Sequence, residues 1–258
     1  MTPAMDDDDL AARVAETAGE MLLRLQRSQL LQGPALGSAG DRMANALIME
    51  VLAFARPNDA ILSEEEASDA ARCARTRVWI VDPLDGTREY SEGRTDWAVH
   101  VALAIDGQPA IGAVALPGMS MTLTSAAPAA VPARQGPLRM LVSRTRPASE
   151  AVAVAAKLGA ELVPMGSAGA KAMAVVRGEA DIYLHTGGQY EWDSCAPAAV
   201  ARAAGLHVSR VDGSQLTYNN ADPYLPDLLI CRPELGLRVL TLVCGARDGS
   251  VAEAVNAA

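Results

Sequence analysis

Residues 79 to 90 read Trp79-Ile80-Val81-Asp82-Pro83-Leu84-Asp85-Gly86-Thr87-Arg88-Glu89-Tyr90. The apolar run from Val78 to Val81, which begins one residue before this segment, has the length of a buried strand, and we expect Pro83 to end that strand. Asp82 and Asp85 are three residues apart, so a turn can direct both carboxylates and the Leu84 carbonyl into one small volume. Two facing carboxylates are costly unless a cation lies between them. The segment therefore indicates a metal site at the end of a strand.

The two residues that follow Asp85 suit a phosphate group. Gly86 permits unusual backbone angles and a close approach, and Thr87 can cap a helix whose free N–H groups favour a phosphate oxygen. Metal and phosphate would then meet at one place. The alternative is an ordinary Asx-type turn with exposed aspartates.

Two further acidic segments are candidates for the same site. Glu64 to Glu66 follow the apolar run 60–62, so at least one glutamate could reach the metal, although an acidic run is also typical of a solvated surface. Asp193, within Glu191 to Pro197, stands at the expected start of an apolar helix that continues to about Ala204. An ordinary helix N-cap is the alternative role for Asp193.

Together these three segments resemble the inositol monophosphatase superfamily, whose members are magnesium-dependent and lithium-sensitive phosphatases. The resemblance covers nearly the whole chain. It implies that Asp41, within Gly40 to Asn45, works with Thr87 to orient and deprotonate an attacking water, whereas the alternative is an N-cap for a helix expected over 42–55. The metal ligands that it implies are Glu64, Asp82, the Leu84 carbonyl, Asp85 and Asp193.

The residues after Gly86 favour one branch of that superfamily. Thr87 to Tyr90 are similar to the Thr-Lys/Arg-Glu-Phe/Tyr of the CysQ type of 3'-phosphoadenosine-5'-phosphate phosphatase. Residues 166–173 resemble the Gly-Ser-x-x-x-Lys element of nucleotide bisphosphatases, and such a small-residue turn before a helix can present N–H groups to an anion. Two departures are Cys195, where a small residue is usual, and Ser38-Ala39-Gly40, which replaces a more threonine-rich lead into Asp41.

The second half of the chain is expected to build most of the substrate pocket. Arg144 follows a predicted strand, so its guanidinium should be free for a second phosphate. Instead of binding substrate, Lys171 could be an ordinary solvated residue on a helix. Tyr183 and His185 could likewise be structural residues whose polar groups are hydrogen-bonded within the protein. The stretch 218–227 suits a base-binding rim or is simply a loop. The predicted substrate contacts are Gly86, Thr87, Ser143, Arg144, Ser167, Lys171, Tyr183 and His185, with Tyr218 as a further candidate.

The resemblance also implies the reaction. We expect hydrolysis of the 3'-phosphate of 3'-phosphoadenosine 5'-phosphate, and also of its sulfated form, in sulfur assimilation. Two or three Mg²⁺ ions are the implied cofactor, with in-line attack by a metal-activated water and no covalent phosphoenzyme. The alternatives are an inositol monophosphate or fructose-1,6-bisphosphate phosphatase, and a non-catalytic metal- or phosphate-binding protein of the same fold.

Composition limits the partners of the protein. A net charge of −9 argues against nucleic acid, and no apolar run is long enough for a membrane span or a signal peptide. The four cysteines have no C-x-x-C spacing and the three histidines are scattered, so a zinc site is not indicated and the cysteines are predicted to be buried. We therefore expect a cytoplasmic protein with a small phosphorylated substrate. The sequence does not give the oligomeric state, but the resemblance admits a homodimer, because dimers are common among the relatives.

The chain pattern predicts an α/β fold of two closely packed subdomains. Helices are expected over 10–27 and 42–55, with a loop between them, and a hairpin turns at Asp106-Gly107. After a linker at 126–137, strands and helices alternate. The resemblance implies a layered αβαβα sandwich with subdomains 1–137 and 138–258 and a site between them, to which Asp193 comes from the second half.

Overall fold

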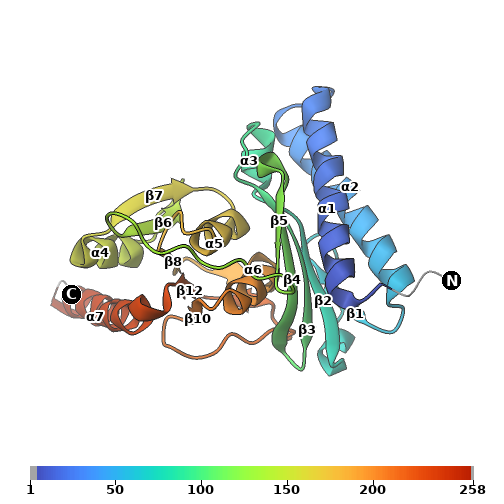
Figure 1. Ribbon diagram of the computed structural model, residues 1–258. Helices are drawn as coiled ribbons and strands as arrows, with labels where there is room; N and C mark the ends of the chain where they lie inside the picture. Colours follow the sequence, from blue (N-terminus) through green and yellow to red (C-terminus); the bar gives the residue numbers. More distant parts are fainter. Residues whose placement is uncertain (1–4, 257–258) are drawn as a thin grey trace.

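The computed structural model describes residues 5–256, with side chains placed for residues 5–246. Its elements form five layers of helices and sheets (Figure 1), which confirms the predicted αβαβα sandwich. Two helices form the first layer, two the central layer and two the last. These helices are α1 (Asp7–Ser28) and α2 (Gly33–Ala55), then α5 (Ala168–Val176) and α6 (Glu191–Ala203), then α4 (Ser149–Leu158) and α7 (Gly236–Asn256).

The first sheet contains the beginning of the segment 79–90, with which the sequence analysis started. Its strands lie in the order β1 (Ala60–Ser63), β2 (Arg77–Asp85), β3 (Ala98–Ile105), β4 (Gln108–Leu116) and β5 (Met121–Thr124). Only the β1–β2 pair is parallel. Alternate residues of β2 face opposite sides: Trp79 and Val81 pack in the core beneath α1 and α2, whereas Val78 and Ile80 join the core around α5 and α6. Burial on both faces explains the continuous apolar run.

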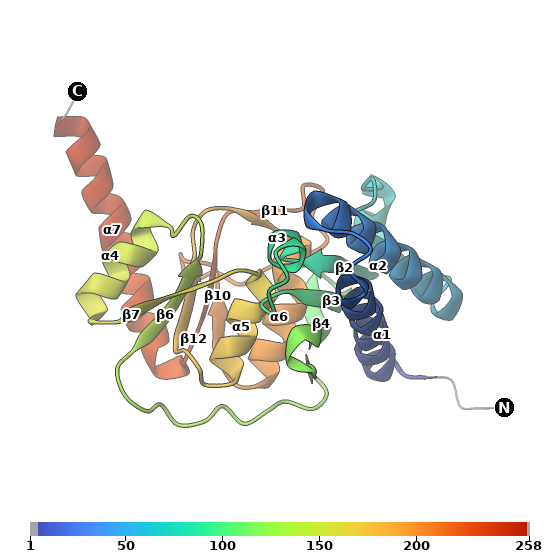
Figure 2. The same ribbon diagram turned by 90° about the horizontal axis from the view of Figure 1, so that it is seen from above.

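The second sheet is mixed. Its order is β10 (His207–Ser209), β12 (Leu228–Cys231), β8 (Ile182–His185), β6 (Arg139–Ser143) and β7 (Glu161–Met165). Seen from above, α5 and α6 lie between this sheet and β3 and β4 (Figure 2). A separate two-stranded ribbon pairs β9 (Gln189–Tyr190) with β11 (Tyr224–Leu225). None of β9 to β12, nor α7, was predicted from the sequence.

The two halves share one hydrophobic core. Leu62 and Ile80 of the first sheet pack in the same cluster as Met173 of α5 and Val200 of α6. The connection between β5 and β6 contains no helix or strand, in agreement with the predicted linker. The division into subdomains at residue 137 stays a prediction. Within residues 5–256, none of the helices is both long enough and apolar enough to span a membrane.

Helix α2 begins earlier than predicted. Residues 33–40, expected to be a loop, are helical, with Pro34 in the first turn. The glycines allow close packing: a Cβ on Gly40 would lie 2.9 Å from the Tyr90 ring, and one on Gly37 would lie 2.8 Å from Thr87 Cγ2. Tertiary packing therefore outweighs the low helix propensity of these glycines. Asp41 lies inside the helix, and its alternative role as an N-cap is wrong.

Strand β2 does not end at Pro83. The strand continues to Asp85, and its pairing with β3 shifts register between Asp82 and Asp85. Such an irregularity tolerates a proline, which has no N–H to give to the ladder. The helix that follows, α3 (Thr87–Ser91), has Gly86 rather than Thr87 at its cap position. The cysteine prediction was also partly wrong, because Cys73 and Cys244 are exposed.

Candidate active site

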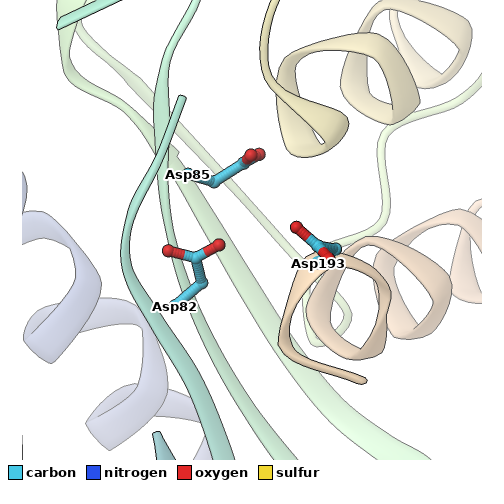
Figure 3. Close-up of side chains that lie close together, drawn as sticks. All are labelled: Asp82, Asp85 and Asp193. Carbon is cyan, nitrogen blue, oxygen red and sulfur yellow. The ribbon is translucent and has the colours of Figure 1, made fainter. Parts of the chain in front are cut away.

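Three aspartates converge where the two halves meet. Asp82 and Asp85 project from the end of β2, and Asp193 projects from the first turn of α6 (Figure 3). One carboxylate oxygen from each lies within 4.8 Å of the others. Asp193 is not the N-cap of α6. Its Oδ2 accepts the N–H of Tyr190 at 2.6 Å, which orients the carboxylate back across the start of the helix.

The charges of this group fit a divalent cation. Burial raises the pKa of Asp82 well above its ordinary value, and repulsion from Glu64, Asp85 and Asp193 adds to that effect. Burial, followed by repulsion from Asp85, also raises the pKa of Asp193 to about 6. Buried carboxylates at such spacing destabilise one another unless a cation compensates them. Carboxylate oxygens are the ligands that hard cations such as Mg²⁺ take in proteins.

Glu64 is a fourth member of this group. It follows β1, and its carboxylate lies close enough to that of Asp82 for repulsion between them, in addition to burial, to raise the pKa of Asp82. Burial raises the pKa of Glu64 to about 7, with repulsion from Asp193 and Asp85 in the same direction. The next two glutamates differ in role, because Glu66 accepts a hydrogen bond from Asn45 and is turned toward α2. Glu64 is therefore the member of the acidic run that lies against Asp82, whereas the charge of Glu65 contributes to the raised pKa of Asp41.

Asp41 and Thr87 lie together beside the carboxylates. The Thr87 hydroxyl is 3.3 Å from Asp41 Oδ1 and 3.1 Å from the Leu84 carbonyl oxygen. Burial raises the pKa of Asp41 to about 6, and repulsion from Glu65 contributes. Both Asp41 and Thr87 border a cavity of about 490 Å³ beneath the start of α2. The structure thus brings together the pair that the resemblance implied.

Asp85 has additional partners in the second half of the chain. It accepts hydrogen bonds from the Ser167 hydroxyl, from Ala168 N at 3.2 Å and from Gly169 N at 2.6 Å, so the N-terminus of α5 meets a side-chain carboxylate. His100 Nε2 lies 3.2 Å from Asp85 Oδ2. Burial opposes ionisation, but His100 and these hydrogen bonds lower the pKa of Asp85 to about 2.

His100 was missed as a site residue. Its ring is fully buried, its Nδ1 lies 3.0 Å from the Trp192 carbonyl oxygen, and a Cβ on Gly169 would lie 2.0 Å from Nε2. The imidazole therefore fills the space between β3, α5 and the start of α6. The signal in the sequence was one polar residue in an otherwise apolar strand, placed by the strand register opposite Asp82.

A second cavity of about 490 Å³ adjoins Asp85 and Asp193. Lys171 lies in its wall and is only 4% exposed, so the solvated alternative is wrong. Its Nζ donates to the carbonyls of Gly166 and Ser167 and lies 5.2 Å from the centre of the Tyr183 ring. Burial lowers the pKa of this ammonium group. Six predicted contacts line the cavity: Gly86, Ser143, Ser167, Lys171, Tyr183 and His185.

Three predicted contacts do not line this cavity: Thr87, which borders the cavity beside Asp41 instead, Arg144 and Tyr218. The Arg144 guanidinium is bound to Glu89 at 2.9 Å and to Glu92 at 2.8 Å, so it is not free for a phosphate as predicted. Tyr218 is buried, with its hydroxyl 3.2 Å from Ser194 Oγ. Asn219 and Asn220, which follow Tyr218, hold the buried Glu191 carboxylate instead of a ligand. The cavity wall also includes Gln189 and Tyr190, which were missed, and Tyr224, which lies in the stretch 218–227 that was offered as a base-binding rim.

Known proteins resemble the chain in sequence and in fold. It is 52% identical over 243 residues to the 3'-phosphoadenosine 5'-phosphate phosphatase of Mycobacterium tuberculosis, with 89% of this chain and 90% of the relative covered. It is 30% identical over 200 residues to the 3'(2'),5'-bisphosphate nucleotidase CysQ of Escherichia coli, covering 73% and 81%. The crystal structure of CysQ from Bacteroides thetaiotaomicron matches with a TM-score of 0.75, at 25% identity over 86% of this chain and 96% of that one.

The match extends to a whole family. The family model described as "Inositol monophosphatase family" matches residues 11–235, which include every carboxylate of the site as well as Thr87 and Lys171. Three segments that are distant in the sequence supply these carboxylates, and the same three carried the resemblance seen in the sequence. The chain belongs to the inositol monophosphatase family.

Proposed function

We propose that this protein is a magnesium-dependent phosphatase that hydrolyses 3'-phosphoadenosine 5'-phosphate to AMP and phosphate, and that it also accepts the sulfated form of this nucleotide in sulfur assimilation. The observation that carries the proposal is the buried group of carboxylates beside the Thr87–Asp41 pair. The 3'-phosphoadenosine 5'-phosphate phosphatase of Mycobacterium tuberculosis, which is 52% identical to this chain, supports the choice of substrate. A cytoplasmic location and a homodimer stay predictions.

Four carboxylates and one carbonyl would hold the cations. Bound divalent cations, two or three in number, would neutralise charge on the transferred phosphoryl group and lower the pKa of the attacking water. The pKa values of Asp82, Asp193 and Glu64 are raised, so protons compete with cations for these groups. The proposed ligands are Glu64, Asp82, the Leu84 carbonyl, Asp85 and Asp193.

Thr87 and Asp41 would orient the attacking water and accept its proton. Asp41, whose pKa is about 6, is mostly ionised at neutral pH and can accept the Thr87 hydroxyl proton. The threonine oxygen then presents a lone pair to a water proton, which turns the water oxygen toward phosphorus. As the water oxygen bonds to phosphorus, its proton would pass to the Thr87 oxygen while the Thr87 proton passes to Asp41. The bond between phosphorus and the ribose 3'-oxygen would break, and that oxygen would take up a proton from solvent.

The Lys171 cavity would hold the departing nucleotide. It adjoins Asp85 and Asp193, so a phosphate at the carboxylates would have its leaving group in this space. Lys171 supplies the buried positive charge, and Ser143, Ser167, Tyr183 and His185 supply polar or aromatic wall. Arg144 would reach a second phosphate only by leaving Glu89 and Glu92.

The deciding experiment compares phosphate release from three substrates with Mg²⁺. We expect kcat/KM for 3'-phosphoadenosine 5'-phosphate to exceed the values for inositol 1-phosphate and fructose 1,6-bisphosphate by about tenfold or more. Li⁺ should inhibit the reaction. A preference for either of the other substrates would keep the metal site but overturn the nucleotide assignment. Absence of release from all three would favour the non-catalytic alternative.

A further inference from the structure

A buried carboxylate anchors the helical turn that carries Asp193. Glu191, the first residue of α6, is fully buried. Its carboxylate accepts hydrogen bonds from Asn219 N at 2.7 Å, from Asn220 N at 2.8 Å and from Asn220 Nδ2 at 2.7 Å. The Glu191 N–H donates to the Pro223 carbonyl oxygen at 2.8 Å. The loop around residues 219–220 therefore fixes both the side chain and the backbone at the start of α6.

Arg72 holds this loop from the other side. It lies in the short helix η1 (Ala70–Ala74) and is 3% exposed. Its Nη1 donates to Asn219 Oδ1 at 2.8 Å, and its Nη2 donates to the Asn220 carbonyl oxygen at 2.7 Å. Asn219 Nδ2 donates in return to the Arg72 carbonyl oxygen at 3.0 Å. The flat fork of a guanidinium suits two oxygens at fixed places, so this contact defines the position of the loop.

The resulting network connects the two segments that bring carboxylates to the site from either half of the chain. Arg72 and Glu64 belong to the same connection between β1 and β2, and Glu191 belongs to the same helical turn as Asp193. A cation and an anion thus lie buried on opposite sides of the loop 219–220. Buried charges of this kind are weak contributors to net stability, and fixing one conformation is the role that suits them.

The place of Asp193 matters because its neighbours come from another element. One of its oxygens lies within 4.8 Å of oxygens of Asp82 and Asp85, which are on β2. Mg²⁺ requires ligand oxygens at about 2.0–2.1 Å in nearly octahedral geometry. A displacement of α6 by a fraction of that distance would therefore weaken the binding of a cation between the two elements.

We propose that Arg72 is a positioning residue of the cation site. Through the loop 219–220 and Glu191 it fixes the first turn of α6, and with it the place of Asp193 relative to the aspartates of β2. This role rests on the proposed metal-dependent function. Arg72 acts through its neighbours and not by contact with a cation or a substrate.

The test uses two effects of opposite sign. Arg72→Met removes a positive charge, and by charge alone this substitution leaves the affinity for Mg²⁺ unchanged or raises it. Loss of positioning lowers the affinity instead. We expect the Kd for Mg²⁺, measured by isothermal titration calorimetry without substrate, to rise about tenfold, as it does for groups that orient metal ligands. An unchanged or lower Kd would overturn the proposal.

Arg232→Met is the matched control for a general loss of stability. Arg232 is 7% exposed, and its Nε lies 2.6 Å from Asp181 Oδ1. Its partners Asp181 and Pro132 belong neither to α6 nor to the connection between β1 and β2. This variant should have a lower melting temperature but the wild-type Kd for Mg²⁺. An equal rise of the Kd in both variants would mean that Arg72 has only a structural role.

A milder variant decides the question if Arg72→Met does not fold. Asn219 has a φ of 64°, in the left-handed region that glycine also adopts. Asn219→Gly therefore keeps the N–H that binds Glu191 and removes the side-chain link to Arg72. We expect a weaker binding of Mg²⁺ in this variant, and an unchanged Kd would contradict the inference.

Calorimetry with Mg²⁺ alone also separates this inference from the choice of substrate. Wild type that binds Mg²⁺ but releases no phosphate from any of the three substrates would overturn the proposed function, while a raised Kd in Arg72→Met would still support the role of Arg72. Active wild type with an unchanged Kd in Arg72→Met would overturn the role of Arg72 alone. Wild type that binds no Mg²⁺ would overturn both.

Discussion

At the scale of single residues, Asp85 has two possible sets of partners. In the structure it accepts hydrogen bonds from Ser167 and Gly169 and lies beside His100, whereas the proposed function requires it to bind a cation. Its pKa of about 2 means that the carboxylate is charged throughout the neutral range and needs no deprotonation to bind. Among the proposed ligands, Asp85 is therefore the one whose removal tests the site most directly.

We expect Asp85→Asn to weaken Mg²⁺ binding by about 100-fold or more and to abolish turnover, because the amide oxygen carries no full charge. Isothermal titration calorimetry and phosphate release measure the two effects, and circular dichroism should show a retained fold. Asp212→Asn, on an exposed loop, is the control. Normal activity of Asp85→Asn at saturating Mg²⁺ would remove Asp85 from the metal site.

Thr87 allows a separation of binding from chemistry. Thr87→Ala should lower kcat by about 100-fold or more, the range for a lost proton-transfer group, with Mg²⁺ affinity nearly unchanged. Thr87→Ser retains a hydroxyl at the same distance from the backbone and should recover much of the rate. Steady-state kinetics give kcat for both variants, and isothermal titration calorimetry gives their affinity for Mg²⁺. Equal kcat for Thr87→Ala and wild type would refute the water-orienting role.

At the scale of elements, prediction from sequence succeeded where the signal was local. Asp82 and Asp85 share one strand end, so their spacing alone placed them together. The prediction that the Arg144 guanidinium is free for a phosphate was wrong, because its partners Glu89 and Glu92 lie more than fifty residues away along the chain. Arg72 likewise gave no sequence signal, because its partners Asn219 and Asn220 lie 147 and 148 residues further along the chain.

The early start of α2 could not be predicted, because the close packing of its glycines is visible only in the tertiary structure. This packing leads to a prediction about stability. Alanine exceeds glycine in helix propensity by about 1 kcal/mol, yet a Cβ on Gly40 would lie 2.9 Å from Tyr90 and 3.0 Å from Leu22. We expect Gly40→Ala to lower the free energy of unfolding by about 1–3 kcal/mol, since overpacking outweighs propensity.

Denaturant unfolding measures this change in free energy. Gly245→Ala, at a helical position of α7 with open space around it, is the matched control and should be neutral or stabilising. Stabilisation by Gly40→Ala similar to that of Gly245→Ala would mean that α2 does not pack closely on α3.

At the scale of the whole molecule, cation-free stability should depend on pH in an unusual direction. The folded-state pKa values of Glu64 at about 7, and of Asp41 and Asp193 at about 6, exceed the ordinary values of 4.5 and 3.8. The folded state therefore binds protons more tightly than the unfolded chain, and stability is lost as the pH rises from about 4 to about 7.

The melting temperature in EDTA should accordingly fall between pH 5 and pH 8, and Mg²⁺ should raise it most at the upper end, where protons no longer compete. Differential scanning calorimetry at both limits measures the effect. A melting temperature in EDTA that is constant or rises over this range would show that the carboxylates do not repel one another as their burial implies.

Because the two halves share one hydrophobic core, we expect them to stay associated even when the backbone between them is cut. Leu62 and Ile80 are packed with Met173 and Val200, while the stretch from β5 to β6 has neither helix nor strand. A protease that nicks this stretch should thus yield two fragments that co-purify and keep their carboxylates facing one another. The same stretch is also a natural position for new termini in a circularly permuted chain.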